Sequence, residues 1–351
     1  MSWLLVTTEL SAEARSALVD ECGYELLDRR GSDPATALAD GAAAGCAGWI
    51  LEGDRCGDEE LSALPALRFV ACVRGGPVNV DTAAATRRGI TVIYTPGRNA
   101  EAVADFVIGQ IIALVRYIAH THHLLRSGAL TEMRATTVRS RADVVWRPAD
   151  PQALVPYHAF RGRELRTLTL GLLGLGRVGE RVASKARALE MRVVAHDPFI
   201  DAATTTVQLV ERAELFAASD VLSLHARGDR VLIGDSELQA MRHGAFLINT
   251  ARGAILDHEA LVAALRSGQL GGAALDVFPD EPLTPGDPLL ELDNVVLTPH
   301  IAGASLNVVD HYSHSLITAL RALREGGDLR GAAVANAETL AGWTPGKEHA
   351  P

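Results

Sequence analysis

Apolar and polar residues alternate in short blocks along the first part of the chain. Four apolar blocks have the length of buried strands, at residues 4–6, 48–51, 69–73 and 91–94. Residues 12–22 instead repeat their apolar positions at helical spacing. Strands that alternate with helices in this way pair in parallel, so the pattern predicts an α/β domain.

Residues 99–126 carry the longest helical pattern in the chain. Asn99 suits the N-cap position, Glu101 falls in the first turn, and residues 103–118 are almost all apolar. A helix that is apolar on most faces is buried on both sides. We therefore expect this helix to pack either between two domains or between two subunits.

A second series of strands and helices occupies residues 168–300. Its strand-like blocks are residues 168–173, 192–195, 221–224, 246–249, 273–275 and 295–297. An irregular segment, residues 131–163, separates the two series, and it is rich in arginine: Arg134, Arg139, Arg141, Arg147, Arg161 and Arg163. The last helical pattern covers residues 307–324, and the density of Gly and Ala beyond it predicts a flexible tail over residues 331–351.

Composition narrows the class of protein. A chain of 351 residues suits about two domains, and a net charge of −10 argues against a nucleic-acid partner. No apolar run reaches the roughly 20 residues of a membrane span, and the N-terminus lacks the features of a signal peptide. The four cysteines form no C-x-x-C pair, which favours buried, reduced thiols in a cytoplasmic protein over a metal site or disulfides.

A glycine-rich turn is the sharpest local signal. Gly174, Gly176 and Gly179 follow one predicted strand and open a predicted helix, which is the context that a dinucleotide-binding motif needs. In that motif the first glycine permits a tight turn, the second lets the backbone approach a pyrophosphate, and the third allows close helix packing. The free N–H groups of the helix N-terminus then face the phosphates.

Asp197 ends the next predicted strand, about 20 residues after the motif. A carboxylate there accepts hydrogen bonds from the adenosine ribose and repels a 2′-phosphate, so the sequence favours NAD over NADP. An arginine elsewhere in the chain would still admit NADP.

Three polar residues follow later strands of this series: Arg252, Glu281 and His300. Ligands of open α/β sheets bind outside the carboxyl ends of the strands. Reduction of a 2-oxo acid needs a group for the carboxylate and a proton donor for the alkoxide, which suit Arg252 and His300. Glu281 would orient the imidazole and raise its pKa. Considered alone, Arg252 could form a surface ion pair, Glu281 could be a solvated loop acid and His300 could be a hydrogen-bonded core histidine. The occurrence of all three after a dinucleotide-binding motif favours an active site.

On these stretches the chain resembles the D-isomer-specific 2-hydroxyacid dehydrogenases, especially their phosphoglycerate-dehydrogenase-like members. The resemblance covers most of residues 45–325, through residues 74–81, 99–116, 171–179, 249–253, 274–282 and 298–303. It implies an α/β fold in which a Rossmann-type NAD domain, residues 99–299, is inserted into a smaller flavodoxin-like substrate domain, residues 1–98 and 300–330. It also implies a homodimer formed largely through the NAD domains.

The resemblance carries residue roles as well. Arg252, Glu281 and His300 match the catalytic set, while the backbone of Gly75 and Gly76, beside Arg74, helps to hold the substrate carboxylate. Asp276 matches the residue that binds the nicotinamide carboxamide. The expected cofactor-binding residues are Gly174, Gly176, Arg177, Val178, Gly179, Asp197, His225, Ala226, Thr250, Ala251, Asp276 and Gly303.

The chain departs from the family pattern in ways that bear on the substrate, a small anionic 2-hydroxy or 2-oxo acid. Glu52 falls where phosphoglycerate dehydrogenases carry an arginine for the phosphate, and Ala226-Arg227-Gly228 replaces the usual proline-containing turn. Arginines of the irregular segment, from the same chain or from across the dimer, would supply another phosphate or phosphonate site: Arg134, Arg139, Arg141 and Arg147.

Two alternatives remain open from the sequence. One is a glyoxylate or hydroxypyruvate reductase that needs no phosphate on its substrate. The other is a non-catalytic dinucleotide-sensing protein on the same fold, since a fold alone does not decide function. The complete set of Arg252, Glu281 and His300 favours an enzyme.

Overall fold

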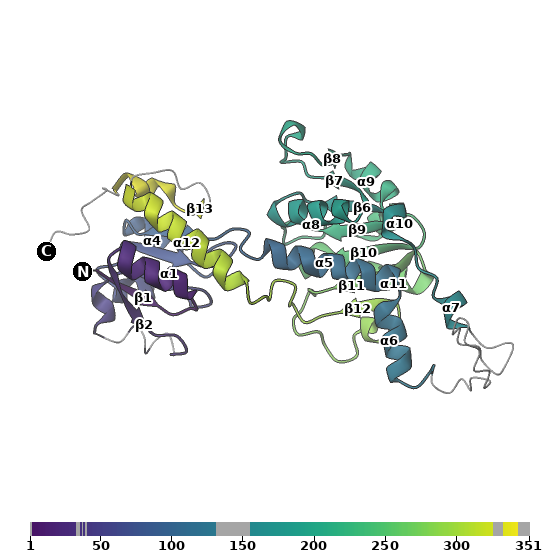
Figure 1. Ribbon diagram of the computed structural model, residues 1–351, viewed down its shortest axis with the longest axis horizontal. Coiled ribbons are helices and arrows are strands. Elements are labelled where there is room, and N and C mark those ends of the chain that lie inside the picture. The colour runs from purple at the N-terminus through teal and green to yellow at the C-terminus, as the bar shows by residue number, and fades with distance from the viewer. Residues whose placement is uncertain are drawn as a thin grey trace, which may run out of the picture. The chain divides into compact units, whose positions relative to one another are not determined.

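The computed structural model describes residues 2–32, 36, 38, 41–130, 155–325 and 333–342 (Figure 1). The chain divides into two compact units. The first unit consists of Met1–Asn99 and Ala304–Pro351, and the second unit consists of Ala100–Gly303. Both are built around parallel sheets, which confirms the predicted α/β class.

The first unit has a six-stranded sheet in the order β13-β5-β4-β3-β1-β2. Its parallel strands are β1 (Ser2–Val6), β2 (Tyr24–Asp28), β3 (Cys46–Leu51), β4 (Phe69–Cys72) and β5 (Thr91–Tyr94). The order 2-1-3-4-5 of these strands is that of flavodoxin-like folds. Central strands of such a sheet are covered on both faces, and Trp49, Ile50 and Val70 are accordingly fully buried.

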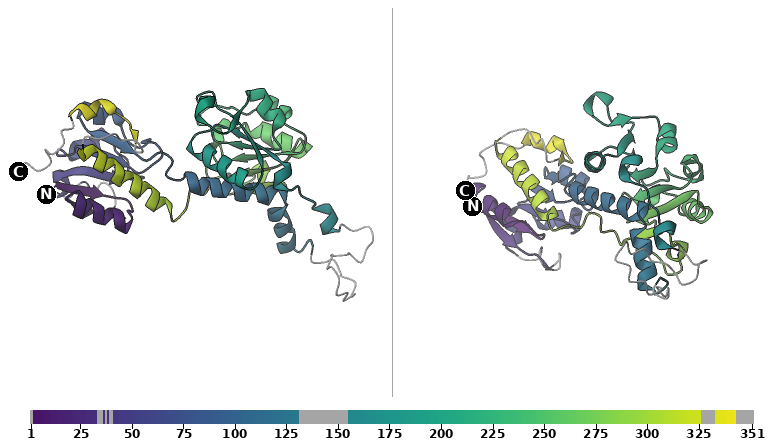
Figure 2. Two further views of the ribbon diagram at one scale, coloured as in Figure 1. Left: turned by 45° about the horizontal axis from the view of Figure 1, so that its top comes forward. Right: turned by 45° about the vertical axis from the view of Figure 1, so that its right-hand side comes forward.

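Short helices connect these strands: α1 (Ala12–Ser16) with the π-helical turn η1 (Ala17–Glu21), η2 (Ala43–Gly45), α3 (Asp58–Ala63) and α4 (Thr82–Arg87). The long helix α12 (Val308–Glu325) returns to this unit and runs beside α1 (Figures 1 and 2). The Ser11 N–H donates to Ser313 Oγ at 3.1 Å, which ties the two helices together.

Part of the predicted tail is ordered. We expected residues 331–351 to be flexible, but in the part that the structure describes, residues 333–342, β13 (Ala333–Val334) pairs antiparallel with β5, and η7 (Ala337–Gly342) follows it. For the rest of residues 331–351, outside the described part of the chain, the expectation stays a prediction. Asn336 explains the difference, because its buried amide accepts from the Val92 N–H and donates to the Ile90 carbonyl, both at 2.8 Å. Composition alone does not reveal such a side-chain anchor.

The second unit has a seven-stranded, all-parallel sheet in the order β12-β11-β10-β9-β6-β7-β8. Its strands are β6 (Thr169–Leu173), β7 (Arg192–His196), β8 (Gln208–Leu209), β9 (Val221–Leu224), β10 (Ala245–Asn249), β11 (Leu270–Leu275) and β12 (Val295–Leu297). Counting from β6, the first six strands follow the order 3-2-1-4-5-6 of a Rossmann fold, with β12 added at one edge.

Helices cover both faces of this sheet (Figures 1 and 2). One face packs on α5 (Ala100–Val115) and α8 (Arg177–Ala188) through a core that includes Val107, Ile111 and Val182. The other face packs on α9 (Arg212–Ala218), α10 (Asp235–Ala240) and α11 (His258–Ser267). The remaining short elements are α7 (Pro156–Ala159), η3 (Leu165–Thr167), η4 (Ala202–Thr204), η5 (Gly253–Ile255) and η6 (Pro288–Glu291).

The single helix predicted over residues 99–126 is in fact two helices, α5 and α6 (Ile118–Arg126), which are bent by 65°. Tyr117 lies at the break with a left-handed backbone, φ 55°. The chain after α7 passes close to it, because a Cβ atom on Gly162 would lie 2.0 Å from the Val115 carbonyl oxygen. Within the described part of the chain, no single helix is long and apolar enough to cross a membrane, and only this bent pair meets the length and composition required.

Candidate active site

The glycine-rich turn joins β6 to α8 and has the geometry that the motif requires. Gly174 adopts φ +97°, and a Cβ atom there would lie 2.7 Å from the Ala226 N atom. A Cβ atom on Gly179 would lie 2.5 Å from the Gly174 carbonyl oxygen. Only glycine fits these two positions without a shift of the backbone.

Gly176 differs from its two neighbours in the motif, because a Cβ atom there would meet no protein atom within 4 Å. Protein packing therefore does not demand a glycine at this position. Gly176 is exposed and is the N-cap residue of α8. The N–H groups in the first turn of a helix have no hydrogen-bond partner within that helix. An open, positively polarised cradle of this kind fits a pyrophosphate, with Arg177 and Val178 in the first turn.

Asp197 lies directly after β7, at the neighbouring strand end. Its carboxylate accepts from the Leu175 N–H at 2.8 Å and from the Phe199 N–H at 2.9 Å. The glycine-rich turn thus holds the acid in place beside the cradle. Hydrogen bonds to both oxygens hold the carboxylate in one orientation at this strand end.

Two further strand ends face the same edge of the sheet. His225 follows β9, where its N–H donates to the Leu173 carbonyl at 2.8 Å and its ring Nε2 lies 2.9 Å from Ser223 Oγ. Burial lowers the pKa of His225 to about 4, so the ring is neutral at pH 7.

Thr250 follows β10, and its buried hydroxyl has no hydrogen-bond partner among the described residues. A buried hydroxyl without a protein partner at this edge is available to hydrogen-bond a bound group. These features, with the glycine cradle, fit a dinucleotide.

Arg252 follows β10 in an extended conformation, and its carbonyl accepts from the Asn249 amide at 2.9 Å. The next residue, Gly253, packs directly against the Phe278 carbonyl, because a Cβ atom there would lie 2.0 Å from it. This close approach brings the Arg252 turn against the segment that carries Glu281. The guanidinium itself is exposed.

Glu281 and His300 form a direct pair. His300 Nδ1 lies 2.7 Å from one Glu281 carboxylate oxygen, and the other oxygen accepts from the Phe278 N–H at 3.1 Å. Partial burial acts to raise the pKa of Glu281, but these two hydrogen bonds and the charges of His300 and Arg252 lower it on balance. The structure therefore brings together the three residues that the sequence predicted.

Asp276 supports the loop that carries His300. It is 1% exposed, and its oxygens accept from Thr298 Oγ1 at 2.7 Å, the Ile301 N–H at 2.9 Å and the Ala302 N–H at 2.8 Å. The Asp276 carbonyl also accepts from the His300 N–H at 2.9 Å, and His300 has φ 54°. The sequence did not suggest this supporting role. Gly303 follows the loop and ends the second unit.

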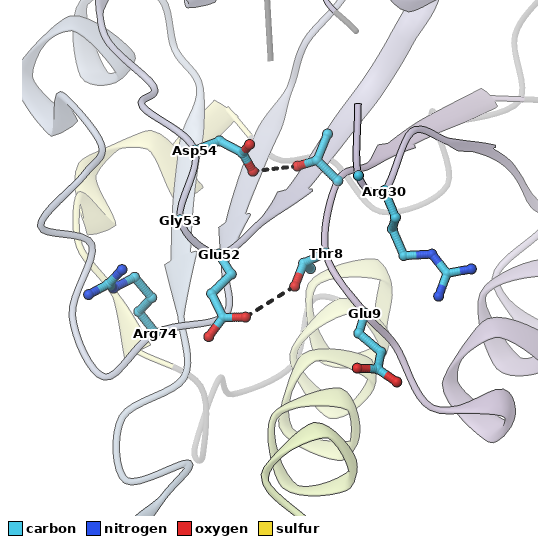
Figure 3. Close-up of a pocket in the computed structure, with 9 residues that line it drawn as sticks. Thr8, Glu9, Arg30, Glu52, Gly53, Asp54 and Arg74 are labelled. Carbon is cyan, nitrogen blue, oxygen red and sulfur yellow. Dashed lines mark hydrogen bonds between the residues drawn. The ribbon is translucent and has the colours of Figure 1, made fainter. Parts of the chain in front are cut away.

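The expected substrate loop lies in the first unit. Arg74, Gly75 and Gly76 follow β4, and Cβ atoms on either glycine would meet nothing within 4 Å. Arg74 also lines a hollow at this end of the sheet (Figure 3). Glu52, in the same unit, forms an ion pair with Arg98 at 2.6 Å. No pattern in the sequence indicates this pair.

The arginine-rich segment is only partly described. Arg134, Arg139, Arg141 and Arg147 lie outside the described residues, so the predicted phosphate site on them is untested. Arg163 instead forms an ion pair with Asp220 at 2.7 Å within the second unit. Among the described residues, no group of three or more acidic, histidine or cysteine side chains is placed to hold a metal ion.

Known proteins are similar to this chain in both sequence and fold. The sequence model of the family described as "D-isomer specific 2-hydroxyacid dehydrogenase, NAD binding domain" matches residues 108–302. A glyoxylate reductase of Aeropyrum pernix is 37% identical over 86% of this chain and 87% of its own. An (S)-sulfolactate dehydrogenase of Chromohalobacter salexigens is 36% identical over 87% of this chain and 93% of its own.

Among solved structures, the TT0316 protein of Thermus thermophilus aligns with a TM-score of 0.73 and 35% identity, over 94% of this chain and 99% of that one. The glycine cradle, the acid after β7 and the family match agree with one another. The chain therefore belongs to the D-isomer-specific 2-hydroxyacid dehydrogenases, and it is an NAD-dependent oxidoreductase that acts on the CH–OH group of its donor.

Proposed function

We propose that this enzyme interconverts a small 2-oxo acid and the corresponding D-2-hydroxy acid, with His300 as the general acid and base. The observation that carries the proposal is the 2.7 Å pair of His300 and Glu281 in the unit that holds the dinucleotide cradle. An imidazole held against a carboxylate is well suited to donate and recover a proton near neutral pH.

Each residue of the site has its own role. In the second unit, Arg252 pairs with the substrate carboxylate. In the first unit, the backbone N–H groups of Gly75 and Gly76, beside Arg74, are candidate contacts for the substrate. His300 donates a proton to the C2 oxygen during reduction and takes it back during oxidation. Glu281 stabilises the imidazolium and fixes the ring orientation. When bound, NADH supplies the hydride that C2 receives.

The cofactor contacts follow from the cradle. Gly174, Gly176, Arg177, Val178 and Gly179 would hold the pyrophosphate, and Asp197 would accept a hydrogen bond from the adenosine ribose, which favours NAD over NADP. On the nicotinamide side we assign His225, Ala226, Thr250, Ala251, Asp276 and Gly303. The orphan hydroxyl of Thr250 supports this assignment.

The substrate has two candidate classes. Relatives that are named glyoxylate reductase and hydroxypyruvate reductase favour a small oxo acid without a phosphate. A phosphate- or phosphonate-bearing acid would depend on the arginines of residues 131–154, beyond the described part. A dinucleotide sensor would need no proton donor, so the paired His300 and Glu281 weigh against it.

Assembly and location complete the proposal. Helix α5 carries half-exposed apolar side chains, including Phe106 and Ile112, and α6 exposes Ile118, which supports a homodimer built on these helices. Cys22, Cys46, Cys56 and Cys72 are buried and form no disulfide with one another, as suits a cytoplasmic protein. Sedimentation velocity would show the dimer, and a monomer at micromolar concentration would contradict it.

The test of the proposed function is cofactor turnover. NADH oxidation is measured with glyoxylate, hydroxypyruvate, phosphohydroxypyruvate and phosphonopyruvate as substrates. Turnover with any of them, and its loss when His300 is replaced, supports a dehydrogenase. NADH binding without turnover across the panel would support the sensor instead.

A further inference from the structure

A histidine and a carboxylate, His258 and Asp287, make a contact in the second unit outside the site described above. His258 Nε2 lies 3.0 Å from one Asp287 oxygen, and the side chains are 26% and 11% exposed, so the contact is largely shielded from water. His258 is the first residue of α11, and Asp287 is the N-cap of η6. The other Asp287 oxygen accepts from the Leu289 N–H at 2.9 Å. The contact therefore joins α11 to the end of the loop that follows β11.

This contact lies on the same two segments of chain as two residues of the candidate site. His258 comes six residues after Arg252, and Asp287 comes six residues after Glu281. The two segments also meet earlier, where the glycine after Arg252 packs directly on the Phe278 carbonyl. They are thus held together at two points, one close to the site residues and one further along the chain.

Both segments are stiff enough to carry a displacement from one end to the other. In the segment after Arg252, Ile255 is fully buried, and its carbonyl accepts from two backbone N–H groups at 2.8 and 3.0 Å. In the segment after Glu281, the rings of Pro282 and Pro285 each fix one backbone dihedral angle. A shift at the far end of either segment is therefore passed on to the site residue at its beginning.

We propose that His258 is a positioning residue of the active site, a proposal that rests on the function proposed above. By holding Asp287, it keeps the segment of Glu281 in register with the segment of Arg252. The substrate carboxylate binds Arg252 while the proton moves at His300, which Glu281 orients, so the reaction needs the two segments at one fixed separation. Misplacement of reacting groups by about 1 Å costs up to roughly a hundredfold in rate.

Two amide variants test the contact with Asp287 while keeping a polar residue at the start of α11. The amide nitrogen of His258→Gln falls at about the reach of the imidazole Nε2, whereas that of His258→Asn is one methylene shorter. We expect His258→Asn to raise KM for the best oxo acid of the panel by about tenfold and to lower kcat, with the Kd of NADH unchanged. His258→Gln should restore both constants to near the wild-type values.

The matched control is Arg242→Gln, which removes an ion pair of the same length, 3.0 Å to Asp220, in the same unit. These two residues precede β10 and β9, at the opposite ends of the strands, so KM should keep its wild-type value. A wild-type KM in His258→Asn would overturn the inference, and so would an equal rise of KM in His258→Asn and His258→Gln. If the wild type turns over none of the oxo acids, the proposed function fails, and this inference fails with it.

Discussion

His300 Nδ1 lies 2.7 Å from the Glu281 carboxylate, and both residues follow strands of the sheet that carries the dinucleotide cradle. The contact fixes the orientation of the imidazole and leaves Nε2 for the substrate. Together with the Phe278 N–H, this hydrogen bond lowers the pKa of Glu281 against the opposing effect of partial burial.

Glu281→Gln should lower kcat for reduction by roughly tenfold or more, because the amide lacks the carboxylate charge that pairs with His300. Turnover at saturating NADH measures the loss. Asp280→Asn, which removes an exposed neighbouring acid, is the control and should keep wild-type kcat. Wild-type turnover in Glu281→Gln would rule out a part for this pair in the proton transfer.

Alanine substitutions at two glycines of the cradle should affect different properties, cofactor affinity at Gly176 and folding stability at Gly179. A methyl group on Gly176 meets no protein atom, so Gly176→Ala should weaken NADH binding by roughly tenfold with at most a modest loss of stability. Gly179→Ala forces a backbone shift against Gly174 and should cost about 1–3 kcal/mol of unfolding free energy. Fluorescence titration with NADH and thermal denaturation measure both. Unchanged NADH affinity in Gly176→Ala would contradict the assigned cradle.

His225 should make the enzyme sensitive to acid. Its pKa is about 4 in the folded chain against an ordinary value of 6.5, so between these pH values the unfolded chain binds a proton that the native chain does not. Stability from this group is complete above pH 6.5 and is lost as the pH falls towards 4. At pH 5 the loss should be about 1–2 kcal/mol. His225→Asn should therefore lose less stability than the wild type between pH 7 and pH 5, in denaturant titrations without cofactor. Parallel losses would show that the ring is not held neutral.

Asn336 should contribute strongly to the stability of the first unit. Asn336→Ala leaves the buried Val92 N–H and Ile90 carbonyl without partners, which should cost about 2–3 kcal/mol of unfolding free energy. Glu338→Gln, at an exposed position of the same segment, should cost little. Equal denaturation midpoints for the two variants would show that β13 is not anchored through Asn336.

The sequence predicted most of the framework, because strand blocks such as residues 221–224 and 295–297 are short apolar runs with clear ends. It missed β2, whose sequence Tyr24–Asp28 contains two acids and lies at a sheet edge. It also missed the break at Tyr117, which has no proline or glycine and depends on the distant contact of Gly162 with Val115. Local patterns do not report contacts of this range.

The candidate site, too, was predicted from the sequence only in part. Arg252, Glu281 and His300 could be picked out because they follow predicted strands and are isolated polar residues in apolar surroundings. The pairing of Glu52 with Arg98 and the support of His300 by Asp276 join residues that are far apart in the sequence. These relationships depend on the packed loops, so they became visible only in the structure.

The role of His300 as the proton donor is best decided by kcat for His300→Ala with the best oxo acid of the panel. We expect a loss of roughly 10²- to 10⁴-fold, with NADH affinity retained. His243→Ala, an exposed histidine before the opposite end of β10, should keep wild-type turnover. Near wild-type kcat in His300→Ala would mean that another group donates the proton.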